Sequence, residues 1–563
     1  MRKPRSIVFG AILAVGLLSL LAGLAYAQLW HQFAHPTQPH PGTNVNISIP
    51  DLVNNPNAVV QRPVLVVLME FTDVTHEADH NVAFFDDLFF GQNRPDGRPS
   101  VAEIVRENSN GRFLMVPATT GDQDGNQDGI VGWATASNQA GCCRQTNATR
   151  DPIKLSSSAC QAQGYTWTAG SSAYYLCWIK EKRAEAVRVA DPFFNYSLYD
   201  TNSDDLITVD ELTVVLINAD DTACDQHIGH PNLPGCTNQA GGNVRATDPS
   251  PVPVEAGQLD VSQAMAGLIE QAHVGVAAHE LGHQTLGLAD LYEATPNVHV
   301  ADGYLLNGTD WHPPPPHVYS MMDRYPPDRI PHLDPWAKIH LGFVEPLVVT
   351  HDGPYTLYDA ETERSFSTQD TQPEAMIIYD PLRSDPYKEY FILENRNQTG
   401  LPDQGLAVWL IDENGASWPS DLNLRKVIRL IRRDGYWASP NDALWDGSDE
   451  TQGYDLTATS TPRNTSWSDG AASYIEIYDI SVAGPSMTFK VRMPPIFVDE
   501  ATPWSIEDGS QQSPYDTVGE AIAAIPEHPR TIRIAGGSYP ETMVINSPLT
   551  LMGWKNGDVV IGQ

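Results

Sequence analysis

The apolar positions along the chain form runs whose length and spacing separate strands from helices. "RPVLVVLMEF" (62–71) and "LTVVLINAD" (212–220) are continuous apolar runs of strand length, which is typical of buried strands. "SVAEIVRENSNGRF" (100–113) has a helical pattern that ends near an Asn-Gly pair. "VSQAMAGLIEQAHVGVAAHELGHQTLG" (261–287) is also helical in pattern, either as one helix or as two helices broken near Gly275. The first half of the chain therefore mixes strands with helices.

The second half of the chain changes to short runs of β type. Between about 350 and 495, runs such as "AMIIYD" and "EYFILENR" are separated by Gly-, Asp- and Pro-rich turns, which predicts a β-sandwich-like domain. The stretch 531–563 alternates short strands with turns and follows the helix-like "DTVGEAIAAIP". It resembles the first coils of a right-handed parallel β-helix of the pectate-lyase kind. A solenoid needs several stacked coils to bury its core, so we interpret this stretch as the start of a truncated β-helix, with a small β-rich tail as the alternative.

The N-terminus has the pattern of an export signal. Basic residues within the first five positions precede an apolar run from Ile7 to Leu24, and "AYAQ" offers a cleavage site after Ala27. Because the apolar run is long, an uncleaved membrane anchor is the alternative. The sequence predicts a secreted bacterial protein that has no stable membrane association once the signal is cleaved.

Composition adds the charge and the size of the protein. The 563 residues carry a formal net charge of −36, and their 41% hydrophobic content allows a sizeable core. Such an acidic excess argues against nucleic acid or an anionic membrane as a partner. It suits a secreted, soluble protein and hard cations such as Ca²⁺, with plain solubility as the alternative explanation.

The cysteines all lie in one part of the chain. An even number of cysteines in an exported chain predicts disulfides, although sequence does not choose the connectivity. We favour the local pair Cys224–Cys236 and expect the adjacent Cys142 and Cys143 to bond to different partners. The six cysteines are Cys142, Cys143, Cys160, Cys177, Cys224 and Cys236.

The strongest chemical signal is "HELGHQTLGLADLY" (279–292). Positions four apart share one face of a helix, so His279 and His283 can direct two imidazole nitrogens at one ion. Glu280 lies beside them and can reach a water molecule without ligating the metal, which is the His-Glu-x-x-His arrangement of zinc hydrolases. The alternative is two surface histidines on an ordinary helix.

A catalytic zinc site needs a third protein ligand. Gly287 can take positive φ and turn the chain, so that Asp290 can return toward the ion and complete a His-His-Asp site. Glu293 is the reserve for this third ligand.

At these residues the chain resembles the immune inhibitor A family of bacterial secreted zinc metallopeptidases. The family motif is His-Glu-x-x-His-x-x-Gly-x-x-Asp, and this chain has one extra residue between His283 and Gly287. Further segments resemble the family in the same order, among them "VLVVLMEFTDV", "YSMMD" (319–323) and "PHLDPWAKIHLGFVEP" (331–346). The resemblance matches Met322 to the family's Met-containing turn.

The resemblance implies a zincin-type α/β (α+β) catalytic domain, Zn²⁺ as cofactor, and protein or peptide substrates. Glu280 would act as general base toward a zinc-activated water. A second donor should stabilise the developing oxyanion; Tyr319, Tyr325, His317 and His340 are candidates that sequence does not rank, and a structural role is the alternative for each. The expected domains are a signal peptide (1–27), a linker or short pro-segment (28–60), a catalytic domain (61–348) with a Cys-rich insertion (121–180), a β-sandwich-like domain (349–495) and the start of a parallel β-helix (496–563).

A second metal-type pattern is "DTNSDDLITVDE" (200–211). It matches a structural Ca²⁺ loop, except that Asp205 replaces the usual glycine at position 6 and must bear an unfavourable left-handed turn. An acidic surface turn is the alternative, and "DQDGNQDG" (122–129) is a weaker match of the same kind. The predicted ligands at positions 1, 3, 5, 7, 9 and 12 are Asp200, Asn202, Asp204, the Leu206 carbonyl, Thr208 and Glu211.

A different class of function is compatible with the same sequence. The chain could be a non-catalytic surface or adhesion protein with a degenerate zinc site and a carbohydrate-binding β-helix. The extra residue in the motif keeps this alternative open. The retention of Glu280 argues against it, since a structural zinc site needs no base.

Overall fold

The computed structural model describes residues from 49 onward, with gaps. The predicted signal peptide, the disulfides and most of the Cys-rich insertion fall outside the described residues. The description omits 1–48, 56, 93, 95, 121–124, 126, 138–141, 145–165, 169–182, 220–251, 255–258, 262–265, 271–272, 289–290, 292–297, 300–303, 306–318, 323–329, 365–370, 384, 399–400, 402, 415–427, 434–442, 448–455, 458–464, 469, 504–506, 526–529, 547 and 563.

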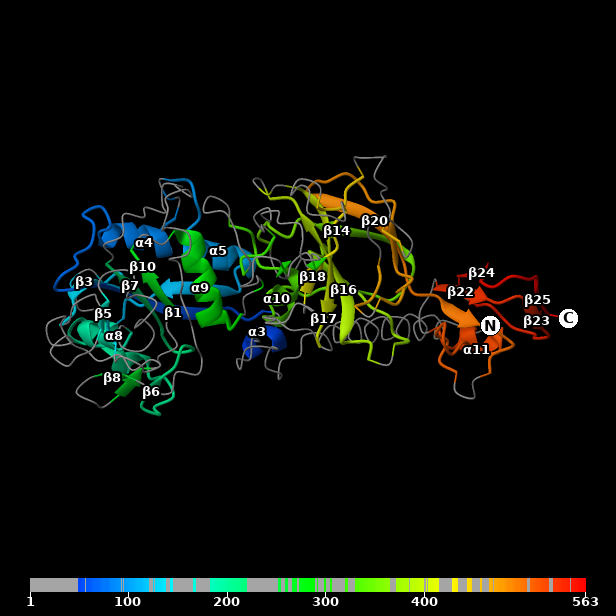
Figure 1. The fold of residues 1–563 in the computed structure, drawn as a ribbon, viewed down its shortest axis with the longest axis horizontal. Helices are drawn as coiled ribbons and strands as arrows, with labels where there is room; N and C mark the ends of the chain where they lie inside the picture. Colours follow the sequence, from blue (N-terminus) through cyan, green and yellow to red (C-terminus); the bar gives the residue numbers. More distant parts are fainter. Residues whose placement is uncertain are drawn as a thin grey trace, which may run out of the picture. The chain divides into compact units, whose positions relative to one another are not determined.

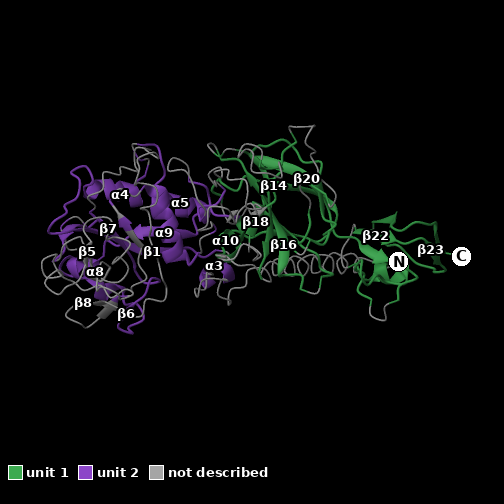
Figure 2. Ribbon diagram, in the orientation of Figure 1, with its two compact units in different colours: residues 1–37, 293–315, 335–563 green, residues 38–292, 316–334 purple. Residues whose placement is uncertain are grey.

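The protein is mixed α/β, with several sheets and few helices among the described residues, and it divides into two compact units (Figures 1 and 2). Unit 2 comprises 38–292 and 316–334, and unit 1 comprises 1–37, 293–315 and 335–563. The mixed α/β class is as predicted, whereas the predicted domain boundaries stay predictions.

Within the described part of the chain, no helix combines the length and the apolar character that crossing a membrane requires.

A five-stranded parallel sheet organises unit 2. The strand order is β10-β7-β1-β2, and β3 also pairs with β1. The side chains of β1 from Val64 to Met69 are wholly buried, as expected for a parallel strand covered on both faces. The two predicted buried strands are therefore confirmed as β1 and β7. The strands are β1 (Val60–Glu70), β2 (Phe113–Pro117), β3 (Ile130–Thr135), β7 (Thr213–Asn218) and β10 (Ala266–Ile269).

Four helices accompany this sheet. The predicted helix near 100–113 is confirmed as α5, which begins with a capping box between Ser100 and Glu103. It is followed by Asn110 and Gly111, which have φ of 53° and 72° and end the helix by a left-handed turn. The helices are α4 (Val82–Phe90), α5 (Val101–Asn108), α8 (Arg183–Ala190) and α9 (Val274–Leu286).

The predicted helix over 261–287 is wrong in its first half. Among the described residues of this stretch, Val274–Leu286 is the helical part, and the preceding Ala266–Ile269 forms strand β10. This strand pairs in parallel with Val215–Asn218 of β7. Pairing with a strand far away in sequence therefore outweighs the local helical periodicity of "AMAGLI".

Two sheets form the β-rich part of unit 1. One has the order β13-β15-β16-β17-β18 and the other β14-β20-β19. Their inward side chains, such as Phe391, Val408 and Phe489, belong to one apolar core, as a sandwich-like domain requires. The elements are α10 (Pro335–His340), β13 (Leu347–Val349), β14 (Gly353–Tyr358), β15 (Ala375–Ile378), β16 (Glu389–Arg396), β17 (Gly405–Asp412), β18 (Ile428–Leu430), β19 (Glu476–Tyr478) and β20 (Ser486–Arg492).

The end of the chain contains parallel strands. β22 pairs in parallel with β21 on one side and with β24 on the other, and β23 pairs in parallel with β25. These strands share a small apolar core, to which β21 contributes Ile496 and Val498 and β22 contributes Ile532 and Ile534. The elements are β21 (Ile496–Val498), α11 (Val518–Ala523), β22 (Arg530–Ile534), β23 (Gly537–Tyr539), β24 (Leu549–Gly553) and β25 (Val559–Ile561).

The remaining elements are short. They are α3 (Pro50–Asn54), β4 (Cys142–Arg144), β5 (Thr166–Thr168), η3 (Asp191–Phe193), η4 (Tyr196–Tyr199), β6 (Leu206–Ile207), β8 (Val252–Val254), β9 (Leu259–Val261), β11 (Val298–His299) and β12 (Tyr304–Leu305).

Candidate metal centre

Helix α9 carries the two predicted zinc ligands. It begins at an N-cap residue, His273, whose Nδ1 accepts a hydrogen bond from the Val276 N–H. It ends at Gly287, which adopts the left-handed conformation with φ of 65°. The predicted turn at Gly287 is confirmed, and it brings the Leu288 carbonyl within 2.7 Å of His283 Nδ1.

The two imidazole rings face each other through their Nε2 atoms. His279 Nε2 and His283 Nε2 lie 3.1 Å apart. Each Nδ1 lies against a backbone carbonyl: Met321 O at 2.8 Å for His279 and Leu288 O at 2.7 Å for His283. A carbonyl only accepts hydrogen bonds, so each Nδ1 must carry a proton, and the two Nε2 atoms are the ring nitrogens that point toward each other.

This arrangement fits a zinc ion. Two facing lone pairs repel unless a proton or a cation lies between them. Ligand nitrogens of one tetrahedral zinc lie roughly 3.3 Å apart, since each Zn–N bond is about 2.0–2.1 Å, and the observed 3.1 Å agrees with this. Zinc-binding histidines also donate their other ring N–H to a carbonyl or carboxylate, as both rings do here.

A tight turn at 319–322 holds the first of these rings. Met321 provides the carbonyl that accepts from His279, and the Met322 carbonyl accepts from Leu291 N–H at 2.8 Å. Met322 is buried against α9, because a Cβ added to Gly282 would lie 2.7 Å from its sulfur. Met322 thus packs against the histidine-bearing helix, and its assignment to the family's Met-containing turn stays a prediction.

The turn is fixed in its place by α5. Asn108, at the end of α5, accepts from the Leu333 N–H at 2.6 Å, and the adjacent His332 carbonyl accepts from the Met321 N–H at 3.2 Å. Ser320 donates to the Asp334 carboxylate at 3.0 Å. A continuous set of buried hydrogen bonds therefore runs from α5 through the turn to His279.

The remaining predicted residues of this centre have different outcomes. Glu280 is buried on α9, with 4% of its surface exposed. Asp290, Glu293, Tyr325 and His317 lie outside the described residues. Tyr319 is buried beside the turn.

His340 has a structural environment. It lies in unit 1 at the end of α10, where its Nδ1 is 2.9 Å from Trp336 O and its Nε2 is 3.6 Å from the Glu413 carboxylate. Burial lowers the pKa of His340 to about 4, so the ring is neutral at physiological pH.

The predicted calcium loop is closed on itself by its own side chains. Asp204 N–H donates to Asp200 at 3.1 Å and to Asn202 at 2.9 Å. Glu211 joins the two ends of the loop, since it accepts from Thr201 N–H at 2.9 Å and from Thr208 N–H at 3.0 Å. Leu206 begins strand β6, directly after these turns.

Two features bear on how this loop would bind a cation. Asp205 adopts the left-handed conformation with φ of 63°, which confirms the strained turn predicted at position 6. Burial raises the pKa of Glu211, but hydrogen bonds from Thr208 and Thr201 more than offset this and lower it. A charged Glu211 and carboxylate oxygens at positions 1 and 5 are the hard donors that calcium prefers.

Two clusters escaped the sequence analysis. Ligand atoms of Glu77, Asp79 and His80 lie within 4.8 Å of one another and could hold a metal ion, and so could those of the acidic group Glu507, Asp516 and Glu520. The sequence signal for the first cluster is "HEADH" (76–80), in the loop that follows the buried strand β1 (Val60–Glu70). Its partner Glu270 is 190 positions from His80, so spacing alone does not reveal it.

Known proteins add no identification. No protein-family model matches the chain, and no curated protein matches it. The resemblance to the immune inhibitor A family therefore rests on the sequence motifs.

Proposed function

We propose that the chain is a secreted zinc-dependent endopeptidase, similar to the immune inhibitor A family, with a zincin-type catalytic domain in unit 2. The observation that carries this proposal is the His279–His283 pair, whose Nε2 atoms lie 3.1 Å apart while each Nδ1 contacts a backbone carbonyl. Histidines that bind zinc hold their other ring nitrogen on a carbonyl or carboxylate in the same way, which supports this proposal.

The residues of α9 divide the chemistry between them. His279 and His283 would hold the zinc, which, when bound, supplies Lewis acidity toward a water molecule and a substrate carbonyl. Glu280 follows His279 on the same helix and would accept the proton of the attacking water and pass it to the leaving amine. The turn at 319–322 orients His279 and so preorganises the centre.

The third ligand is proposed as Asp290. The N–H of the neighbouring Leu291 donates to the Met322 carbonyl. The carbonyl of Met321, in the same turn, orients His279. The chain after Gly287 thus returns to the turn that supports the first ligand. Leu291 is buried, with 3% of its surface exposed.

The C-terminal strands support the further proposal of a β-helix start. The parallel pairing of β21, β22 and β24, in which Ile496 lies opposite Ile532, supports this proposal because successive coils of a β-helix pair in parallel. A carbohydrate-binding, non-catalytic protein remains the alternative class, and a test of proteolysis separates the two.

The proposed function is tested by metal analysis together with a casein-cleavage assay on the purified chain. We expect zinc in the protein, cleavage of casein, and loss of cleavage on chelation that zinc restores. Zinc-replete protein that leaves casein and a broad peptide library intact would contradict the peptidase proposal.

We expect Asp290→Ala to lower zinc affinity by at least about tenfold, whereas Glu293→Ala leaves it unchanged, because a catalytic zinc site loses a direct ligand only in the first variant. The measurement is zinc occupancy at a buffered free-zinc concentration. Loss of metal in Glu293→Ala with retention in Asp290→Ala would show that the extra residue in the motif has moved the third ligand.

We expect calcium to stabilise the fold through 200–211. Cation binding to the folded form alone adds about 2.7 kcal/mol at a hundredfold excess over Kd, so the melting temperature should rise with millimolar Ca²⁺. Glu211→Gln should weaken this response, because the residue is the predicted bidentate ligand. Asp210→Asn is the matched control, since the Asp210 side chain is 79% exposed and pairs with Arg62.

The calcium experiment uses protein that has been stripped of metal and reloaded with zinc. A melting temperature that does not change when calcium is added would exclude the calcium site.

A further inference from the structure

The loop after β1 brings metal-ligating side chains to the carboxyl edge of the parallel sheet. β1, β3, β7 and β10 all run parallel, so their carboxyl ends meet at one edge. Open parallel sheets bind ligands at this edge. Glu270 directly follows β10, and its N–H donates to the carbonyl of Asn218, the last residue of β7.

His80 is held in a buried position by a carboxylate. Its Nδ1 lies 3.2 Å from Glu270 Oε2, and Glu270 is wholly buried. The same oxygen accepts the Glu77 N–H at 2.9 Å, so Glu270 fixes both the imidazole and the loop backbone. A carboxylate that orients a histidine in this way is the usual support of a metal-binding imidazole.

The loop is preorganised by aromatic contacts. His76 stacks on Trp133 of β3 with ring centroids 4.5 Å apart and an interplanar angle of 4°. Its Nδ1 lies 2.9 Å from Glu70, the last residue of β1. Trp133 Nε1 also donates to the His80 carbonyl at 2.8 Å. The loop between β1 and α4 therefore reaches the cluster in a defined conformation.

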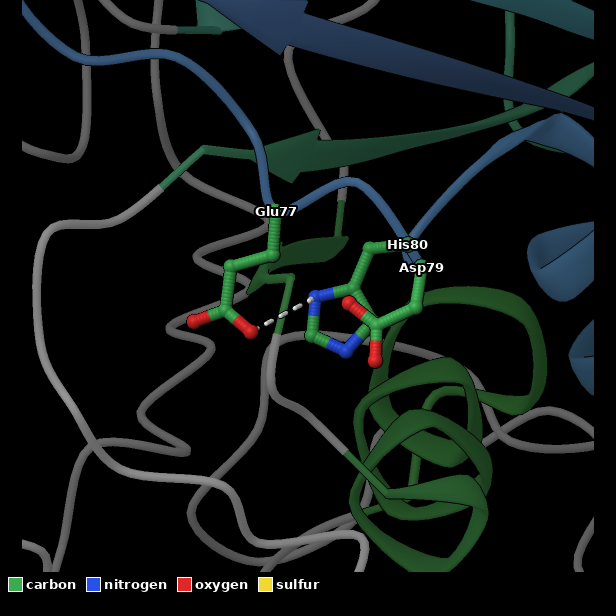
Figure 3. Close-up of side chains that lie close together, drawn as sticks. All are labelled: Glu77, Asp79 and His80. Atoms are coloured by element: carbon green, nitrogen blue, oxygen red, sulfur yellow. Dashed lines mark ion pairs between the residues drawn. The ribbon is translucent and has the colours of Figure 1, made fainter.

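Three donor side chains gather at the His80 ring, with Glu77 Oε2 4.0 Å from His80 Nδ1. Figure 3 shows the Glu77 carboxylate directed at the His80 ring, with the Asp79 carboxylate beside the same ring, and ligand atoms of the three residues lie within 4.8 Å of one another. His80 is 4% exposed, whereas the Glu77 side chain is 46% exposed, so the cluster has a buried base and an open side. An ion could enter from solvent and bind against a fixed imidazole.

A buried amide side chain also lies at the end of β7. Asn218 is 2% exposed, and neither its side-chain oxygen nor its side-chain nitrogen has a hydrogen-bond partner in the described part of the chain. Such buried amides are rare without a bound water or ion.

We propose that Glu77, Asp79 and His80 bind one divalent first-row transition cation, with Glu270 as the residue that positions His80. One imidazole nitrogen and two carboxylates form a mixed donor set that suits Zn²⁺ or Mn²⁺, whereas calcium prefers oxygen ligands alone. This site shares no residue with the His279–His283 centre. The proposal therefore stands whether or not the chain is a peptidase.

The test counts zinc equivalents in the full chain, stripped of metal and then saturated with calcium. Equilibrium dialysis against buffered zinc should give a second equivalent beyond the His279–His283 centre. The paired variant Glu77→Gln with Asp79→Asn should bind that equivalent at least about tenfold more weakly. Asp73→Asn, an exposed change in the same loop, should bind zinc as the unchanged protein does.

A variant without the His279–His283 centre allows the Glu77–Asp79–His80 site to be measured alone. The paired variant His279→Ala with His283→Ala should keep one zinc equivalent and a zinc-dependent rise in melting temperature. Both should disappear when Glu77→Gln and Asp79→Asn are added. The proposal is overturned if the His279→Ala, His283→Ala protein binds no zinc, or if Glu77→Gln with Asp79→Asn leaves stoichiometry and affinity unchanged.

Discussion

Glu280→Gln should leave zinc bound and lower kcat for peptide cleavage by roughly 10²–10⁴-fold. The substitution keeps the shape of a side chain that is 4% exposed and removes only its ability to accept a proton. His279 and His283 keep their carbonyl contacts, because neither hydrogen bond involves Glu280. Zinc content and casein cleavage, measured on the same preparation, test both parts of this expectation.

The matched control is Glu107→Gln on α5, whose side chain is 36% exposed. Its kcat should stay within a few-fold of the unchanged protein. Full activity in Glu280→Gln would remove the residue from the mechanism, and loss of zinc would make it a ligand instead of a base. Inactivity of the unchanged protein with zinc bound would favour the non-catalytic alternative.

The local patterns in the sequence predicted most of the elements around the site. The buried strands β1 and β7, helix α5 and the left-handed turn at Gly287 depend on nearby residues, so apolar runs and turn signals reveal them. The His-Glu-x-x-His spacing gives the shared face of α9 for the same reason. What a residue contacts within about one helical turn is therefore readable from the sequence.

Contacts between distant segments were not predictable in the same way. The local pattern of β10 is helical, and the strand forms only through pairing with β7, which lies about fifty positions earlier in the chain. Local periodicity therefore predicted a helix there. The carbonyl that orients His279 belongs to Met321, and any residue type could supply it. The contact between Glu270 and His80 likewise cannot be predicted from residue spacing, since it depends on the order of strands in the sheet.

A buried ionic network joins the two-sheet core of unit 1 to the helix before it. Arg396, at the end of β16, has a fully buried side chain that pairs with Glu394 at 2.7 Å and with Glu361 at 3.1 Å. Burial raises the pKa of Glu361, although Arg396 and Lys338 oppose this shift. Lys338 of α10 is also buried and donates to the Ala360 carbonyl at 2.9 Å. Arg396 and Lys338 are therefore the cations that favour the charged form of Glu361 in the interior.

We expect Arg396→Met to lower the free energy of unfolding by about 3–5 kcal/mol at pH 7.5, because it leaves two buried carboxylates without their main partner. The folded-state pKa of Glu361 already lies above its ordinary value, and removing the Arg396 cation raises it further. A raised acid pKa destabilises the folded state above that pKa, so the deficit should shrink as the pH falls to 5.5. Urea unfolding at the two pH values measures this effect.

Arg492→Met is the matched control for this experiment. Arg492 pairs with Glu476, and their side chains are 34% and 19% exposed, so solvent screens the pair and its loss should cost less than about 1 kcal/mol. Adding Glu361→Gln to Arg396→Met removes one uncompensated charge and should restore part of the lost stability. If Arg396→Met and Arg492→Met lose equal stability at both pH values, the buried network does not hold this core together.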